Sequence, residues 1–226
     1  MSVLSTEQIA ARLVHDDPDH RLVITPILDP ENQLKKGQAS FDVRLGRSFS
    51  LPRPWHHSSM EDLSSTLLSI PVVEEVVLDY GQPLVLHPHQ FVLARTLEVV
   101  RLPVSLMAYV VGRSSWGRRG LTVATATAVH PRFYGPITLE LKNVGELPIS
   151  LYTFDRVAQL VFHTVDTGTA ELPSQPSQFS FGFVPNLGRP RDEATRKKIE
   201  ALVKRRRDAE DEAGGATIQA LAGDDE

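Results

Sequence analysis

Short apolar stretches separated by turn residues, running from Leu22 to Val165, constrain the fold more than any other feature of this sequence. The clearest is residues 38–49, where Phe41, Val43 and Leu45 alternate with polar or small side chains. A period of two is typical of a β-strand with one face toward a core. None of these stretches carries a helical period long enough for a βαβ unit. The pattern therefore favours an all-β barrel or sandwich over a doubly wound sheet.

Residues 38–49 also place charged side chains on the face opposite the apolar one. Asp42 and Arg44 lie on that face and could pair with each other. An exposed pair would contribute about 0–1 kcal/mol to stability. A buried pair near an interface would instead act as an anchor.

Further strand candidates follow from apolar or β-branched runs bounded by Gly, Pro and Asp. They are residues 22–27, 72–78, 83–87, 90–97, 99–111 with a break at Pro103, 137–141, 149–152 and 157–163. Before them, Ser5 and Gln8 stand at capping-box spacing and predict a helix over about residues 5–14, with Ile9, Leu13 and Val14 on its apolar face.

The composition changes after Asp166, which suggests three parts of the chain. Residues 1–165 are expected to form the β core with its N-terminal helix, and residues 166–190 a loop rich in Pro, Ser and Gly. Residues 191–226 are expected to form a charged helix followed by a flexible tail. The basic run 204–207 is followed by acidic residues, which favours a solvated helix over a nucleic-acid-binding patch.

Composition also excludes several kinds of function. The sequence contains no cysteine and eight scattered histidines, with no His-x-Glu pattern, so thiol chemistry, disulfides and a zinc site are not expected. The net charge of −4 gives no general attraction to nucleic acid. The sequence has no basic-then-apolar N-terminus and no run of about 18 apolar residues, so neither a signal peptide nor a membrane span is expected. We expect a cytoplasmic protein.

The segment from Gly112 to Glu140 contains the candidate anion-binding and catalytic residues. It begins with a turn rich in Gly, Ser and Arg, of the kind that gathers N–H, hydroxyl and guanidinium donors around anionic oxygens. It ends in an apolar strand with one acid, Glu140. A carboxylate on such a strand is costly unless it has a partner or a task, so Glu140 is either an ion-pair partner, for example of Arg118, or a catalytic group.

Five blocks of the sequence, in order, resemble the dCTP deaminase branch of the trimeric dUTPase-like family. These blocks are QASFDVRLG (38–46), LVLHPHQFVLARTLEVVRLP (84–103), GRSSWGRRGL (112–121), ITLELKNVGELPISLY (137–152) and RVAQLVF (156–162). The resemblance implies a mainly β fold, with a dUTPase-like barrel or jelly-roll-like core, an N-terminal helix and a charged C-terminal helix or tail. It also implies a homotrimer with nucleotide sites between neighbouring subunits, binding dCTP or dUTP with Mg²⁺ on the triphosphate.

The implied activity is zinc-independent hydrolysis of dCTP to dUTP and ammonia, which fits the missing His/Cys cluster of metal-dependent deaminases. By the same resemblance, Glu140 is the general acid/base, and Ser114 and Arg118 assist it. The implied substrate-binding residues are Arg113, Ser115, Trp116, Gly117, Ala126, His130, Thr138, Leu139 and Gln159.

The sequence departs from the family pattern at His130. The family commonly reads Ile-Asp-Pro-Gly before its catalytic strand, and this chain reads Val129-His130-Pro131-Arg132. In dUTPases the aspartate helps to activate water for attack on the α-phosphate, so we expect weak or absent pyrophosphate release.

The usual phosphate-closing tail of the family is not recognisable after residue 165. A replacement lid within residues 166–190 or just beyond would use Phe179, Phe181, Arg189 and Arg191.

Three alternatives stay open on the sequence alone. The protein could be a dUTP diphosphatase or a bifunctional enzyme that ends at dUMP. It could be a non-catalytic, nucleotide-binding regulator of the same fold. A modified cytosine nucleotide could also be the substrate.

Overall fold

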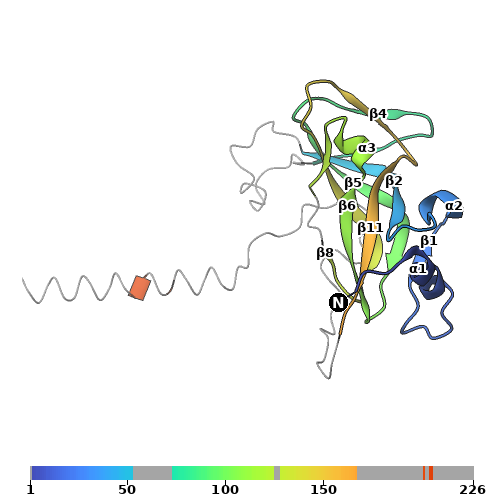
Figure 1. Cartoon of the computed structure of the whole chain (residues 1–226). Coiled ribbons are helices and arrows are strands. Elements are labelled where there is room, and N and C mark those ends of the chain that lie inside the picture. The colour runs from blue at the N-terminus through green and yellow to red at the C-terminus, as the bar shows by residue number, and fades with distance from the viewer. Residues whose placement is uncertain (1, 53–72, 125–127, 167–200, 202–203, 206–226) are drawn as a thin grey trace, which may run out of the picture. The chain divides into compact units, whose positions relative to one another are not determined.

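The computed structural model describes residues 2–52, 73–124, 128–166, 201 and 204–205 (Figure 1). The chain divides into a unit of residues 1–186 and a unit of residues 187–226. Of the second unit only residues 201, 204 and 205 are described, and all three are helical. The predicted lid loop and most of the charged C-terminal segment therefore lie outside the described residues.

The described part of the first unit is built mainly from strands, as the sequence pattern predicted. In chain order the strands are β1 (Val23–Thr25), β2 (Phe41–Pro52), β3 (Val73–Val77), β4 (Pro83–Leu86), β5 (Phe91–Arg101), β6 (Leu106–Gly112), β7 (Leu121–Val123), β8 (Ala128–Val129), β9 (Tyr134–Asn143), β10 (Ile149–Tyr152) and β11 (Arg156–Thr164). Its helices are α1 (Thr6–Leu13), α2 (Pro30–Gln33) and α3 (Ser114–Gly117).

Nine of the strands form one curled sheet in the order β7-β9-β5-β2-β11-β6-β8, with β1 added to β5 and β3 added to β2. Strands β4 and β10 form a separate pair. The register of β2 against β5 shifts between Leu45 and Phe49, and such irregularities bend a strand. Different parts of the bent strand β2 therefore pair with three other strands, β3, β5 and β11.

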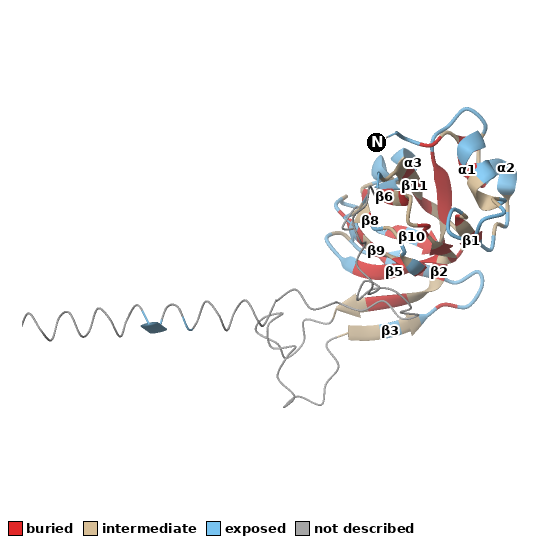
Figure 2. Ribbon diagram, turned by 90° about the horizontal axis from the view of Figure 1, so that it is seen from below, coloured by how far each residue is buried: buried red, intermediate tan, exposed pale blue. Residues whose placement is uncertain are grey.

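The core lies inside this curled sheet and is built from the alternating apolar residues of the long strands. Figure 2 shows buried residues on the central strands β2, β5 and β11. Phe41, Val43 and Leu45 are fully buried, as the period-two pattern predicted. The opposite face of β2 is not simply polar and exposed, because Asp42 and Ser50 are buried as well. This strand is covered on both faces for much of its length.

The N-terminal helix forms where the capping box placed it. The Ser5 hydroxyl accepts a hydrogen bond from Gln8 N, and the Gln8 side chain accepts one from Ser5 N. Ile9 is fully buried, but Val14 lies just past the helix and is 79% exposed. Val14 is therefore not part of the apolar face, which is a correction to the sequence prediction.

A buried carboxyl that the sequence analysis did not single out connects β5 to α2 and β2. Glu98 has no exposed surface. One of its carboxyl oxygens accepts from Gln33 Nε2 at 2.8 Å and the other accepts from Arg44 N at 2.9 Å. Burial raises the pKa of Glu98 to about 7, although these N–H donors act in the opposite direction. Gln33 also donates to the Asp42 carbonyl at 3.1 Å, so α2 is tied to the sheet from within.

Candidate functional site

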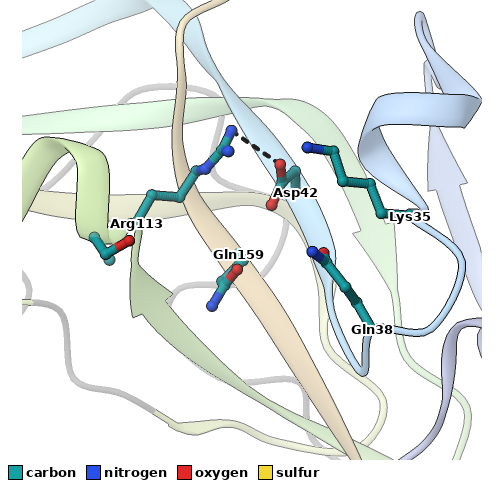
Figure 3. Close-up of a pocket in the computed structure, with 7 residues that line it drawn as sticks. Lys35, Gln38, Asp42, Arg113 and Gln159 are labelled. Carbon is teal, nitrogen blue, oxygen red and sulfur yellow. Dashed lines mark ion pairs between the residues drawn. The ribbon is translucent and has the colours of Figure 1, made fainter.

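A polar pocket lies where β2, β11 and β6 run side by side (Figure 3). Its volume is about 240 Å³. Its lining residues come from the loop after α2, from β2 and β11, and from the end of β6 with the start of α3. They are Lys35, Gln38, Asp42, Gly112, Arg113, Ser114 and Gln159. Three of the residues predicted from the sequence, Arg113, Ser114 and Gln159, therefore meet in one pocket.

Strand register explains how two of these residues come together. Asp42 on β2 and Gln159 on β11 are directly paired, so their side chains point from the same face of the sheet. Gln159 Oε1 lies 3.4 Å from the Ser40 hydroxyl, which donates to it. The register of β11 against β6 then brings Gly112 and the following turn to the same place.

Asp42 is the electrostatic centre of the pocket. Its Oδ2 atom lies 2.9 Å from Arg113 Nη1 and 3.3 Å from Arg156 Nη1, and only 5% of the residue is exposed. Burial raises its pKa above the ordinary value, while Arg113, Arg156 and Lys35 act in the opposite direction. The predicted pair between Asp42 and Arg44 is not formed, because Arg44 pairs with Asp29 at 3.4 Å instead. Asp42 is buried and pairs with Arg113 and Arg156 in place of Arg44.

The turn that carries Arg113 is held to β11 by two hydrogen bonds. Arg113 N donates to the Val157 carbonyl at 3.1 Å, and Trp116 Nε1 donates to the Arg156 carbonyl at 2.9 Å. Ser114, Ser115, Trp116 and Gly117 make up the single turn of α3, and Arg118 follows as its exposed C-cap residue. Trp116 is therefore a packing residue of the turn in this chain, with its indole directed at β11 rather than lining the pocket.

Directly after α3, the backbone at Gly120 lies in close contact with the backbone at Gly145. Gly120 has φ +91°, and a Cβ atom placed there would lie 2.8 Å from Gly145 N. Both the backbone angle and the close approach require glycine. Val144 N donates to the Gly120 carbonyl at 2.8 Å, which fixes the α3 segment against the end of β9.

Glu140 lies on β9, outside the pocket. It is half-buried, and burial raises its pKa above the ordinary value. On β9, Glu140 lies three residues before Asn143, a separation of about 10 Å along the strand. Asn143 pairs with Leu121, the first residue of β7. The ion pairs of the described residues do not include one between Glu140 and Arg118. Among the described residues, the lining of the pocket includes Ser114 but neither Arg118 nor Glu140.

The other predicted residues fall into three groups. Thr138 lies on β9 opposite Arg95, and Leu139 is fully buried in the core, so its side chain faces away from any ligand. His130 is exposed after β8. Ala126 lies outside the described residues. Beside His130, Arg132 has φ +65°, the left-handed region that favours glycine, at the position where the family commonly has one.

Lys35 and Gln38 line the pocket and Arg156 pairs with Asp42 there, and the sequence analysis named none of the three as site residues. Lys35 lies in a loop after α2, and no local pattern distinguishes it from Lys36. Arg156 belongs to a family-like block but carries no local sign that its partner is Asp42, which lies 114 residues away. Glu98 could have been singled out from the sequence, because it is an acid within an apolar strand. The same pattern singled out Glu140.

Fold and pocket together define a class of protein: a mainly β fold with a polar pocket lined by arginine, lysine, serine and glutamine. The family model described as dCTP deaminase-like matches residues 3–165, and the chain belongs to this family. The resemblance stated from the sequence is therefore confirmed.

Relatives with this similarity come from archaea and bacteria. The chain is 36% identical over 211 residues to a protein of Methanobrevibacter smithii named dCTP deaminase, dUMP-forming, covering 91% of this chain and all of that one. It is 42% identical over 159 residues to a Dictyoglomus turgidum protein of the same name, covering 69% and 78%. A Haloarcula marismortui protein named dCTP deaminase is 40% identical over 170 residues, covering 73% and 82%.

A solved structure supports the fold. The 2′-deoxycytidine 5′-triphosphate deaminase of Agrobacterium tumefaciens superposes with a TM-score of 0.52 at 23% sequence identity, covering 71% of this chain and 46% of that one. The predicted mainly β fold with an N-terminal helix is confirmed. Among the described residues, no helix is long and apolar enough to cross a membrane, and no group of three or more His, Asp or Glu residues is placed to hold a metal.

Proposed function

We propose that this protein hydrolyses the 4-amino group of dCTP, with Glu140 as the general acid/base and with Ser114 and Arg118 assisting. The observation that carries the proposal is the similarity to proteins named dCTP deaminase, at 36% identity over 91% of this chain and at 42% identity over 69% of it. The pocket supports it, because Arg113, Ser114 and Gln159 present donors suited to phosphate oxygens.

The reaction needs a group that accepts and then returns protons. Water attacks C4 of the cytosine ring as a base takes its proton, so a C–O bond forms while the C4=N3 double bond opens and N3 takes up a proton. The C4–N bond to the amino group then breaks as the new hydroxyl loses its proton to form C=O and a proton is delivered to the departing amine, and the products are dUTP and ammonia. One carboxyl can accept the first proton and supply the later one, and positioned acid–base catalysis of this kind contributes about 10²–10⁴-fold.

Glu140 suits this role because burial raises its pKa. A carboxyl with a raised pKa is a stronger base when ionised and holds the proton more readily afterwards. Ser114 is exposed at the start of α3, where its hydroxyl can both donate to and accept from a water molecule. The exposed guanidinium of Arg118 favours the ionised form of a nearby carboxylate.

The proposal includes an assembly because the family resemblance implies a homotrimer and because Glu140 is not among the residues that line the pocket. A site shared between neighbouring subunits of a homotrimer would bring α3 of one copy to Glu140 of another. Mg²⁺ would arrive as the complex with the triphosphate, because Mg²⁺ is usually held by substrate phosphates and one or two carboxylates. Of the described pocket residues only Asp42 is acidic, and it already pairs with two guanidinium groups. We place the reaction in the cytoplasm, in agreement with a sequence that has no cysteine.

A second step to dUMP has a specific observation in its favour. The Methanobrevibacter smithii and Dictyoglomus turgidum relatives are both named dUMP-forming. The opposing observation is His130, which stands where the family commonly has an aspartate. We therefore propose dUTP as the first product, with hydrolysis of dUTP to dUMP and pyrophosphate as the alternative outcome.

The test is to incubate the purified full chain with dCTP, CTP, dCMP and dUTP and to identify every product. We expect dUTP and ammonia from dCTP. Glu140→Gln should lose turnover and keep its circular dichroism spectrum, whereas the matched control Glu146→Gln, on the exposed loop after β9, should keep turnover.

The bifunctional enzyme and the nucleotide-binding regulator each have their own signature in this experiment. Release of pyrophosphate from dUTP would establish the bifunctional reaction. Tight binding of dCTP with no product over long incubation would identify a nucleotide-binding regulator and refute the proposal. Full activity in Glu140→Gln would show that the acid/base assignment is wrong.

A further inference from the structure

We propose that the N-terminal segment supplies a second wall of the pocket, on which Lys35 and Gln38 bind the polyphosphate chain of the nucleotide. The proposal deepens the proposed function and rests on it for the identity of the ligand. The geometry that carries it is the placement of Lys35 and Gln38 across the pocket from Arg113 (Figure 3).

Helix α1 holds this wall in place. The buried residue Thr6 donates from its hydroxyl to the Lys35 carbonyl at 2.9 Å and to the Gln38 carbonyl at 2.6 Å. Thr6 N also donates to the Gln38 carbonyl, at 2.9 Å. These bonds fix the backbone on either side of Lys36 and Gly37. The N-terminal helix therefore positions the loop that lines the pocket.

The same loop is held from its other end by α2. Gln33 is buried, donates to Glu98 and to the Asp42 carbonyl, and accepts from Leu28 N and Asp29 N at 3.1 Å each. Leu34 and Lys35 follow directly. Lys35 thus lies between two anchored points, which lowers the conformational entropy lost when its side chain binds a ligand.

The charges around the pocket favour an anion. Asp42 is the one acid of the lining, and Arg113 and Arg156 both pair with it. Lys35 therefore adds a positive charge in excess. Figure 3 shows its ammonium group and the Arg113 guanidinium on opposite sides of the Asp42 carboxyl.

Hydrogen-bond donors are also available for a ligand. In the part of the chain that the structure describes, the Lys35 ammonium forms no ion pair, and neither the side-chain amide of Gln38 nor the Ser114 hydroxyl makes a hydrogen bond to another described residue. Ammonium, amide and hydroxyl donors that meet in one pocket suit phosphate oxygens better than they suit a neutral ligand.

Inorganic tripolyphosphate is the probe that tests this wall directly, with binding measured by titration calorimetry on the full chain. We expect Lys35→Gln to weaken binding about tenfold, which corresponds to about 1.4 kcal/mol. The matched control is Lys36→Gln, because the neighbouring Lys36 is exposed, carries the same charge and does not line the pocket. It should bind within about twofold of wild type. Lys35→Arg keeps the charge and should retain most of the affinity.

The outcomes separate this inference from the proposed function. Equal affinities in Lys35→Gln and Lys36→Gln, or no binding of tripolyphosphate by the wild type, would overturn the inference even if dCTP is deaminated. A selective loss in Lys35→Gln would support the anion wall even if dCTP is not turned over, and in that case only the proposed reaction would fail.

Discussion

Glu98→Gln should remove a pH dependence of stability that the buried Glu98 carboxyl creates. Burial raises the pKa of Glu98 from the ordinary 4.5 to about 7 in the folded chain. Between these two values the folded chain binds more protons than the unfolded chain, so stability falls as pH rises. The loss begins near the lower pKa and is complete above the upper one. The difference between the two pKa values corresponds to about 3 kcal/mol.

Glutamine is neutral throughout this range, so the variant lacks this contribution. The stability of wild type minus that of Glu98→Gln should therefore fall by about 2–3 kcal/mol between about pH 5 and about pH 8. A separate cost of about 1–3 kcal/mol, the same at every pH, arises because the new amide N–H₂ faces N–H donors from Gln33 or Arg44.

The assay is urea unfolding followed by circular dichroism at fixed protein concentration, since any oligomer would make the midpoint depend on concentration. Glu146→Gln is the control, because Glu146 is an exposed glutamate and its removal should leave the pH profile of the wild type unchanged. A difference between wild type and Glu98→Gln that stays constant from about pH 5 to about pH 8 would refute the reasoning.

Two further predictions concern the pocket and the turn beside it. Asp42→Asn should destabilise the chain by about 2 kcal/mol and raise the KM for dCTP, because two guanidinium groups lose a shared buried carboxylate. Asp29→Asn breaks a more exposed pair and keeps a capping side chain, so it should cost clearly less, and equal costs in the two variants would contradict the assignment. Gly120→Ala should cost about 2–4 kcal/mol in unfolding experiments, since it adds a close contact with Gly145 to an unfavourable φ. Gly37→Ala, with φ +79° and open space around it, should cost about 1 kcal/mol, so a similar loss at both positions would show that the contact is unimportant.

Local patterns in the sequence predicted much of the fold because they depend on near neighbours along the chain. The alternation in β2 and the capping box of α1 are of this kind, and both are present in the structure. The same reasoning did not predict the short helix α2 and assigned α3 to a turn, because a single helical turn has no period to detect. It also extended the apolar face of α1 to the exposed Val14.

The sequence by itself determined the family, the strand-rich fold and the turn that carries Arg113 and Ser114. The tertiary structure alone decided what Asp42 pairs with, because its arginine partners come from β11 and the end of β6 and are brought together by strand register. It also decided that Lys35 lines the pocket while Lys36 does not, and that Glu140 lies outside it. Long-range pairing and burial set these contacts, and neither depends on the local order of residues that a sequence pattern records.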